Sequence, residues 1–102
     1  MQEAETTMPG ILAATWTDGV FVFDADARRQ ELAGHSVRDL APDQNGSVLA
    51  IVDGHALCRR TREGVWSTLA TSQPVLASVL VVGDAIYLGT DDARVLRVDQ
   101  RG

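Results

Sequence analysis

The chain has 102 residues, a mass of 10.9 kDa, and 9 basic against 14 acidic side chains, which is the size of a single domain. Hydrophobic residues make up 45% of it and its mean hydropathy is −0.01, values that argue against a mostly disordered chain. Every basic residue is an arginine, and because the arginines are scattered among more numerous acids, we expect no nucleic-acid partner.

Residues 1–10 are acidic and lack the positive and apolar regions of a secretory signal. No apolar run approaches the ~20 residues that a membrane helix requires, and an acidic surface matches anionic membranes poorly. We therefore expect a cytoplasmic chain with no membrane partner. A secreted chain whose signal had been removed would have the same features.

In chain order, short β-rich runs alternate with turn residues, and no window shows the sustained 3.6-residue apolar period of a helix. The only helix-compatible segment is Ala25–Leu32. Asp18-Gly19 and Asp53-Gly54 stand between apolar runs, which is a strong hairpin signal because a type I′ turn favours positive φ in its central residues. This pattern predicts an all-β, antiparallel meander. The predicted strands are Ile11–Trp16, Val20–Phe23, Val37–Ala41, Val48–Val52, Ala56–Arg59, Val65–Leu69, Leu76–Val82, Ile86–Gly89 and Val95–Val98.

One predicted hairpin occurs three times. The copy that begins at Ile86 and ends at Val98 aligns without a gap on the copy from Ile11 to Phe23, and a further copy begins at Val48. The starting positions 11, 48 and 86 give a period of 37 to 38 residues. When the Asp-Gly pairs are aligned, the middle copy is two residues shorter before its turn.

Two further strands follow each of the first two hairpins: Gln30–Ala33 and Val37–Ala41 after the first, Val65–Leu69 and Leu76–Val82 after the second. Four short antiparallel strands per ~40 residues are typical of a β-propeller blade. We therefore predict one propeller segment over residues 1–102, with about 2.5 to 3 four-stranded blades at roughly 1–33, 34–72 and 73–102. The last blade lacks its outer strand, and the polar residues 1–7 give the first no clear inner strand. A small β-sandwich is the alternative, which the periodicity disfavours.

Three consecutive stretches carry a known pattern: Leu32–Val37 with its Gly-His, Leu40–Asp43 ending in Pro-Asp, and Gly46–Ala50. Together they resemble the WD repeat. This resemblance implies that His35 hydrogen-bonds Asp53, the aspartate of the turn after the second strand, in a structural network that fixes the blade. A plain surface histidine is the alternative, because the companion tryptophan of that network is absent. Arg60–Trp66 resembles a degraded Asp-box of the bacterial neuraminidase repeats.

Trp16 lies at the end of a predicted strand, where propeller loops emerge, and is the candidate ligand-facing residue. Blade-to-blade packing is the default role for the other aromatic residues, and Trp16 has stacking on a sugar as its alternative. The single Cys58 excludes an intramolecular disulfide and a multi-cysteine metal site. We expect it to be a small buried hydrophobe, although Arg59 and Arg60 could lower its pKa.

No residue is predicted to be catalytic, to bind a cofactor or to hold a metal. Asp24 with Asp26, and Asp91 with Asp92, lack the array of oxygen ligands that a calcium loop needs, so we expect turn aspartates. His55 follows a turn and is expected to be solvated.

These features predict a non-enzymatic propeller module, or a piece of one, that binds a partner through its blade loops. The alternatives are a part of a sialidase-like glycosidase propeller and a lectin-like carbohydrate binder that uses Trp16. Three blades in an open arc leave two apolar faces exposed. We therefore expect either the remainder of a larger propeller or self-association, in which Gln2–Thr7 of a neighbour could supply the missing outer strand.

Overall fold

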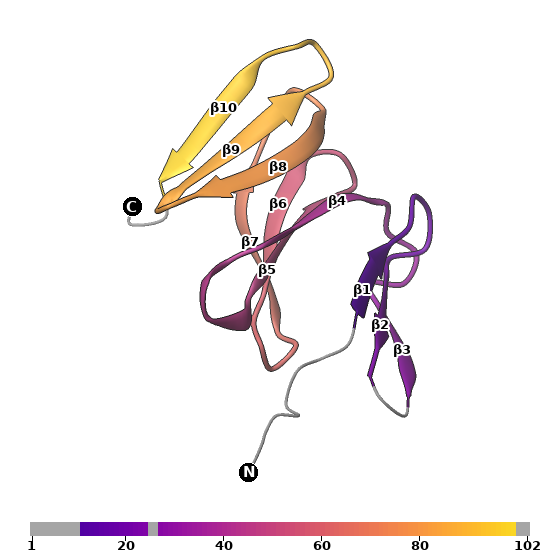
Figure 1. The fold of residues 1–102 in the computed structure, drawn as a ribbon. Coiled ribbons are helices and arrows are strands. Elements are labelled where there is room, and N and C mark those ends of the chain that lie inside the picture. The colour runs from indigo at the N-terminus through magenta and orange to yellow at the C-terminus, as the bar shows by residue number, and fades with distance from the viewer. Residues whose placement is uncertain (1–10, 25–26, 100–102) are drawn as a thin grey trace.

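The computed structural model describes residues 11–24 and 27–99 (Figure 1). Within these ranges the chain forms three antiparallel sheets and one short 3₁₀ helix, η2 (Gln44–Gly46). The first sheet contains β1 (Ile11–Ala14), β2 (Val20–Phe23) and β3 (Arg28–Glu31). The middle sheet contains β4 (Val37–Pro42), β5 (Val48–Val52), β6 (Ala56–Arg60) and β7 (Trp66–Thr71). The last sheet contains β8 (Leu76–Val82), β9 (Ala85–Thr90) and β10 (Val95–Asp99).

The all-β, antiparallel prediction is confirmed, and strands lie at each predicted run. The predicted strand Gln30–Ala33 is present but begins and ends two residues earlier, as β3 (Arg28–Glu31), so the helix-compatible interpretation of Ala25–Leu32 is wrong where the structure describes that segment. Its residues pair with β2 from Phe23↔Arg28 to Val20↔Glu31, so a non-local ladder overrides the local helix propensity. In the part of the chain that is described, no helix has the length and apolar character to cross a bilayer.

The three hairpins have one common register. Their equivalent pairs are Ile11↔Phe23, Val48↔Arg60 and Ile86↔Val98. Each pair therefore encloses the same number of residues, and the predicted shortening of the middle copy is wrong. The position of the Asp-Gly pair within the loop differs instead: φ is positive at both Asp53 and Gly54, as a type I′ turn requires, but only at Gly19 of the pair Asp18-Gly19.

The first strands of the middle and last sheets also repeat one geometry. Strand β4 has a bulge between Val37 and Asp39, and β8 has one between Leu76 and Ser78. The first residue of each strand donates its backbone N–H to the hairpin loop of the preceding sheet: Val37 to the Thr15 oxygen at 2.9 Å and Leu76 to the Gly54 oxygen at 2.6 Å. The period of 37 to 38 residues therefore corresponds to the distance along the chain between equivalent positions of successive sheets. The sheets are connected by residues 32–36 and 72–75.

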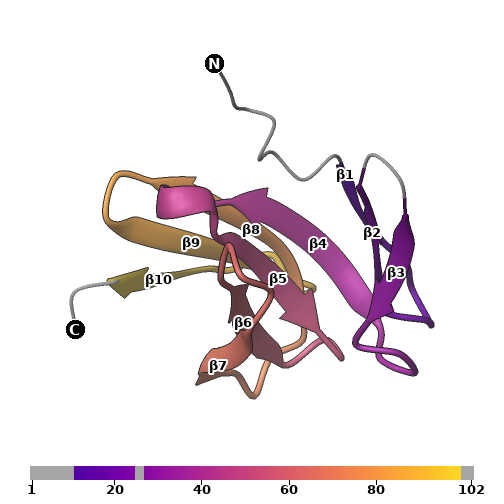
Figure 2. The same cartoon turned by 90° about the horizontal axis from the view of Figure 1, so that it is seen from below.

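The core consists of two layers, one on each side of the middle sheet (Figure 2). Successive side chains of a strand point to opposite faces, so Leu49 and Ile51 face the last sheet while Ala50 and Val52 face the first. This explains why β5 is an uninterrupted apolar run. The layer toward the last sheet contains Ala41, Leu49, Ile51, Leu57, Leu76, Val79, Ile86 and Leu88. The layer toward the first sheet contains Val20, Val22, Val37, Ala50, Val52 and Cys58.

The outer faces of the first and last sheets are not covered by any described residue. Ile11 and Phe23 are 64% and 38% exposed on the first sheet, and Leu80 and Val95 are 59% and 72% exposed on the last. The three sheets form an open stack rather than a closed ring (Figure 1). Gln2–Thr7, which we expected to complete a neighbouring blade, lies outside the described residues.

Candidate functional site

The hairpin loops of all three sheets meet at one end of the stack, and Arg38 joins them. Arg38 lies in the bulge of β4, where it has no residue directly opposite on β5. Its guanidinium carbon lies 5.3 Å from the centroid of the Trp16 ring in the first loop. A Cβ placed on Gly54 in the middle loop would lie 3.9 Å from Arg38 Nε. Arg38 Nη1 is 3.5 Å from the Asp91 carboxylate in the last loop, a long contact.

We call this surface the loop rim and define it by Trp16, Arg38, Gly54 and Asp91. The predicted ligand-facing residue, Trp16, lies on it and is 68% exposed. A cation above an exposed ring contributes about 0.5–1 kcal/mol, so Arg38 holds the indole in place while most of its surface stays open to solvent. Residue spacing alone did not identify Arg38.

His35 and Asp53 lie beside the loop rim and are in contact. His35 Nδ1 is 2.6 Å from Asp53 Oδ2, and the Ser36 N–H donates to Asp53 Oδ1 at 3.0 Å. The hydrogen bond from His35, followed by that from Ser36, lowers the pKa of Asp53 below its ordinary value. Both side chains are about half exposed, at 50% and 53%. The pair joins the start of β4 to the turn after β5, which is a structural arrangement.

His55 fixes the other side of the same turn. Its Nδ1 lies 2.9 Å from the Ser72 oxygen, and the Ser72 N–H donates to the His55 oxygen at 2.8 Å. The expectation of a merely solvated histidine is therefore incomplete, because His55 ties the middle loop to the end of β7. The loop rim rests on a turn that is anchored from both sides.

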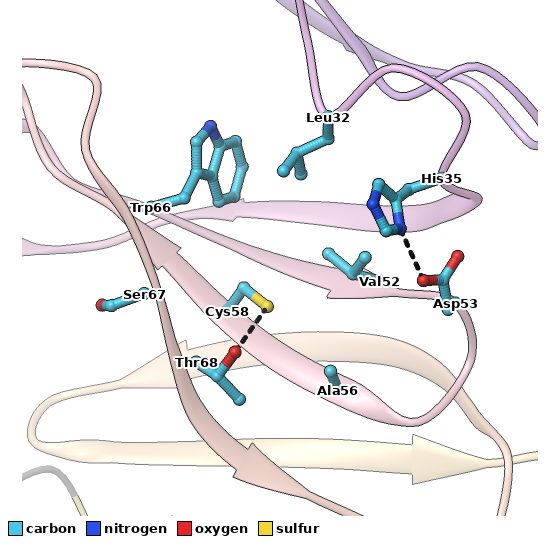
Figure 3. Close-up of a pocket in the computed structure, with 9 residues that line it drawn as sticks. All are labelled: Leu32, His35, Val52, Asp53, Ala56, Cys58, Trp66, Ser67 and Thr68. Carbon is cyan, nitrogen blue, oxygen red and sulfur yellow. Dashed lines mark hydrogen bonds and ion pairs between the residues drawn. The ribbon is translucent and has the colours of Figure 1, made fainter.

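A hollow of about 280 Å³ lies next to His35 and Asp53, on the side of the middle sheet that faces the first sheet (Figure 3). Leu32 and Trp66 stand on one side of it, and Cys58 and Thr68 lie across from them (Figure 3). Four of the nine lining side chains are apolar: Leu32, Val52, Ala56 and Trp66. His35, Asp53, Ser67 and Thr68 supply its polar groups, together with the thiol of Cys58.

Cys58 is buried, as its place in a strand predicted. Its Sγ lies 3.8 Å from Thr68 Oγ1, and burial is the main reason that the pKa of the thiol is raised. The expected help from neighbouring arginines does not occur, because Arg59 pairs with Asp43 at 3.1 Å and Arg60 pairs with Glu31 at 2.7 Å. The thiol is therefore protonated at neutral pH and is not an activated nucleophile.

A buried polar cluster joins the first sheet to the middle sheet. The Glu31 carboxylate accepts hydrogen bonds from Arg60 Nε at 2.7 Å and from Arg60 Nη2 at 3.1 Å. Trp66 Nε1 donates to the same carboxylate at 2.9 Å. These bonds, mainly those from Arg60, lower the pKa of Glu31 and raise the pKa of Arg60. The sequence analysis did not identify this cluster. The residue that could have indicated it is Arg60, a charged residue at an inward-facing position of β6.

The described carboxylates of the two predicted pairs contact arginine side chains. Asp24 pairs with Arg29 at 2.6 Å, and Asp92 contacts Thr90 Oγ1 and pairs with Arg94 at 2.8 Å. Asp26 lies outside the described residues. Among residues 11–24 and 27–99, no group of three or more potential ligand side chains could hold a metal ion.

Arg60–Trp66, the stretch that resembles an Asp-box, forms the turn between β6 and β7. The Thr61 N–H donates to the Val65 oxygen at 2.9 Å, and the Val65 N–H donates to Thr61 Oγ1 at 3.1 Å.

Comparisons of the chain with models of protein families, with curated proteins and with solved structures found no match.

Proposed function

We propose that the chain is a segment of a β-propeller that acts as a non-enzymatic scaffold and binds a protein partner through the loop rim. The repeated hairpin register, the repeated bulge and the repeated backbone bond between successive sheets support the propeller assignment. The observation that carries the function is the position of Arg38, which lies over the ring of the exposed Trp16, reaches Asp91 in the last loop and lies beside Gly54 in the middle loop.

This arrangement favours binding for two physical reasons. Tryptophan and arginine are the residues most enriched among those that dominate binding energy at protein interfaces. A platform that is already held in place also avoids much of the entropy cost of ordering on association. The cation–π contact and the anchored turn at Asp53 and His55 supply that order.

The two alternatives use the same scaffold differently. A lectin-like binder would stack a sugar on Trp16, whose exposed ring supports this second candidate. A sialidase-like glycosidase would need catalytic residues, which are usually held within hydrogen-bond reach of one another. The raised pKa of the Cys58 thiol and the structural use of the Asp53 carboxylate count against those two groups as its catalytic residues.

The test is a selection of binding peptides from a random display library on the immobilised chain. We expect selected peptides to lose more than about tenfold in affinity on Trp16→Ala and on Arg38→Ala, since such residues carry ~2 kcal/mol or more at hot spots. Arg62→Ala is the matched control, because Arg62 is exposed in the turn between β6 and β7, away from the loop rim.

The scaffold proposal would be contradicted if the selected peptides bind with unchanged affinity after both substitutions. It would also be contradicted if the selection yields no binding peptides. Trp16-dependent binding on a glycan array without any peptide binding would favour the lectin alternative. Turnover of a fluorogenic glycoside would overturn the non-enzymatic assignment.

A further inference from the structure

The outward face of the last sheet repeats a face that is covered in the middle sheet, and it carries Arg97 opposite Tyr87 beside its apolar residues. Cross-strand partners share a face, so the pairs Leu80↔Tyr87 and Gly89↔Val95 lie together on the side away from the middle sheet. The equivalent pairs of the middle sheet are Ala41↔Leu49 and Ile51↔Leu57. All four of those residues are buried against the last sheet. In the middle sheet these positions pack against the last sheet. The equivalent positions of the last sheet have no described sheet packed on them.

The outward face of the first sheet has the same relation to the middle sheet on the opposite side. The pairs Val48↔Arg60 and Ala50↔Cys58 of the middle sheet are equivalent to Ile11↔Phe23 and Ala13↔Phe21. Ala50 and Cys58 are buried against the first sheet, whereas Ile11 and Phe23 are 64% and 38% exposed. One end of the stack thus presents a face for a following sheet, and the other end presents a face for a preceding sheet.

We infer that two copies of this chain associate head to tail, so that the last-sheet face of each copy packs on the first-sheet face of the other. The inference rests on the proposed propeller assignment. A contact between two different surfaces closes into a ring only when the repeated rotation returns to its start. Propellers have typically ~4–8 blades, so three sheets are too few and three copies would be too many. Two copies fall within the range.

A ring of two copies would have two junctions and four buried end faces. If each of the four end faces contributes roughly 300 Å², the low end for a functional apolar patch, the two junctions bury about 1,200 Å², which is within the range of specific interfaces. Leu80 and Val95 are exposed aliphatic side chains of this face, and no described sheet covers them.

The test is light scattering of the isolated chain at micromolar concentration, with one aspartate placed on each face. We expect the wild type at twice 10.9 kDa, and both Ile11→Asp and Val95→Asp at the monomer mass. Val65→Asp is the matched control: Val65 is 61% exposed, close to Val95 at 72%, but lies in the turn between β6 and β7. It should remain dimeric.

A monomeric wild type, or a dimer that survives either face variant, would overturn the inference. In particular, a dimer lost in Val95→Asp but kept in Ile11→Asp would show back-to-back packing of two last sheets. Circular dichroism confirms that each variant is folded, and Leu80→Asn with Phe23→Asn replaces any variant that is not. Peptide binding at the loop rim is measured on the same variants, so a monomer that still binds leaves the proposed function standing.

Discussion

Replacing Glu31 with alanine tests the junction between the first and middle sheets. The wild-type carboxylate accepts three hydrogen bonds, two from Arg60 and one from Trp66. Arg60 is only 4% exposed, so Glu31→Ala leaves a guanidinium that is buried and has lost its main counter-charge. Breaking one partner of a buried ion pair costs about 3–5 kcal/mol.

We expect a loss near the lower limit, about 3 kcal/mol, because the Glu31 side chain keeps 17% exposure and water can reach the site. A domain of this length has a total free energy of unfolding of roughly 5–15 kcal/mol, so the variant loses a large share of its stability. Urea unfolding followed by Trp66 fluorescence measures the change. Arg62→Ala is the control: Arg62 is exposed in the turn between β6 and β7, and removing an exposed charge should cost less than about 1 kcal/mol.

The junction between the middle and last sheets supplies the rescue. There the positions equivalent to Glu31 and Arg60 hold Ala70 and Val98, which pack in an apolar layer. The double variant Glu31→Ala/Arg60→Val removes the buried charge together with its partner, so it should recover a substantial part of the loss. A single variant that loses less than about 1 kcal/mol, or a double variant no more stable than the single one, would refute the reasoning.

The same pair predicts a pH dependence. The pKa of Glu31 in the folded chain lies below its ordinary value of 4.5, chiefly because Arg60 hydrogen-bonds the ionised carboxylate. A depressed folded pKa gives stability that is present above the unfolded pKa and is lost as the pH falls through the folded pKa. The wild type should therefore lose more stability below about pH 4.5 than the double variant does, in urea titrations at successive pH values.

Three further predictions concern the remaining turns and the thiol. Gly19→Ala should destabilise the chain far more than Gly34→Ala in urea unfolding: both have positive φ, but a Cβ at Gly19 collides with backbone carbonyls at the end of β3, whereas one at Gly34 meets nothing within 4 Å. Cys58 should react with Ellman's reagent only as fast as the protein opens, and a rapid reaction of the native chain would contradict its burial. His35→Ala should cost at most about 1 kcal/mol, because the pair with Asp53 is half exposed; a larger loss in the same assay would assign it a stronger structural role.

The strands and the common register of the first and last hairpins could be predicted because they depend on local signals. Alternating apolar residues and Asp-Gly turns are read within a few positions of one another, and the no-gap alignment of the first and last hairpins reappears as an identical register. Strand β3 is predicted two residues too late, at Gln30–Ala33, because Arg28–Glu31 has no apolar alternation of its own. Its conformation comes from pairing with β2, which local sequence does not reveal.

The site residues divide in the same way. His35 and Asp53 were paired through a family resemblance, and Trp16 was placed through its position at a strand end. Arg38 and Glu31 were missed, because each acts on a different sheet from its own: Arg38 on the loops of both neighbouring sheets, Glu31 on Arg60 of the middle sheet. Contacts between stacked sheets have no fixed spacing along the chain, so residue spacing cannot indicate them.

The chemistry of the two junctions differs although their geometry repeats, and this difference restricts how the sheets can associate. The first sheet turns Glu31 toward the middle sheet, where Arg60 is its partner. The equivalent junction on the other side of the middle sheet offers Ala70 and Val98 instead. If the face with Glu31 packed on the apolar last sheet, the carboxylate would be buried without a counter-charge, at a cost of several kcal/mol. The faces left free for a second copy are those that carry Ile11 and Val95, with Arg28 opposite Phe23 on the first and Arg97 opposite Tyr87 on the second.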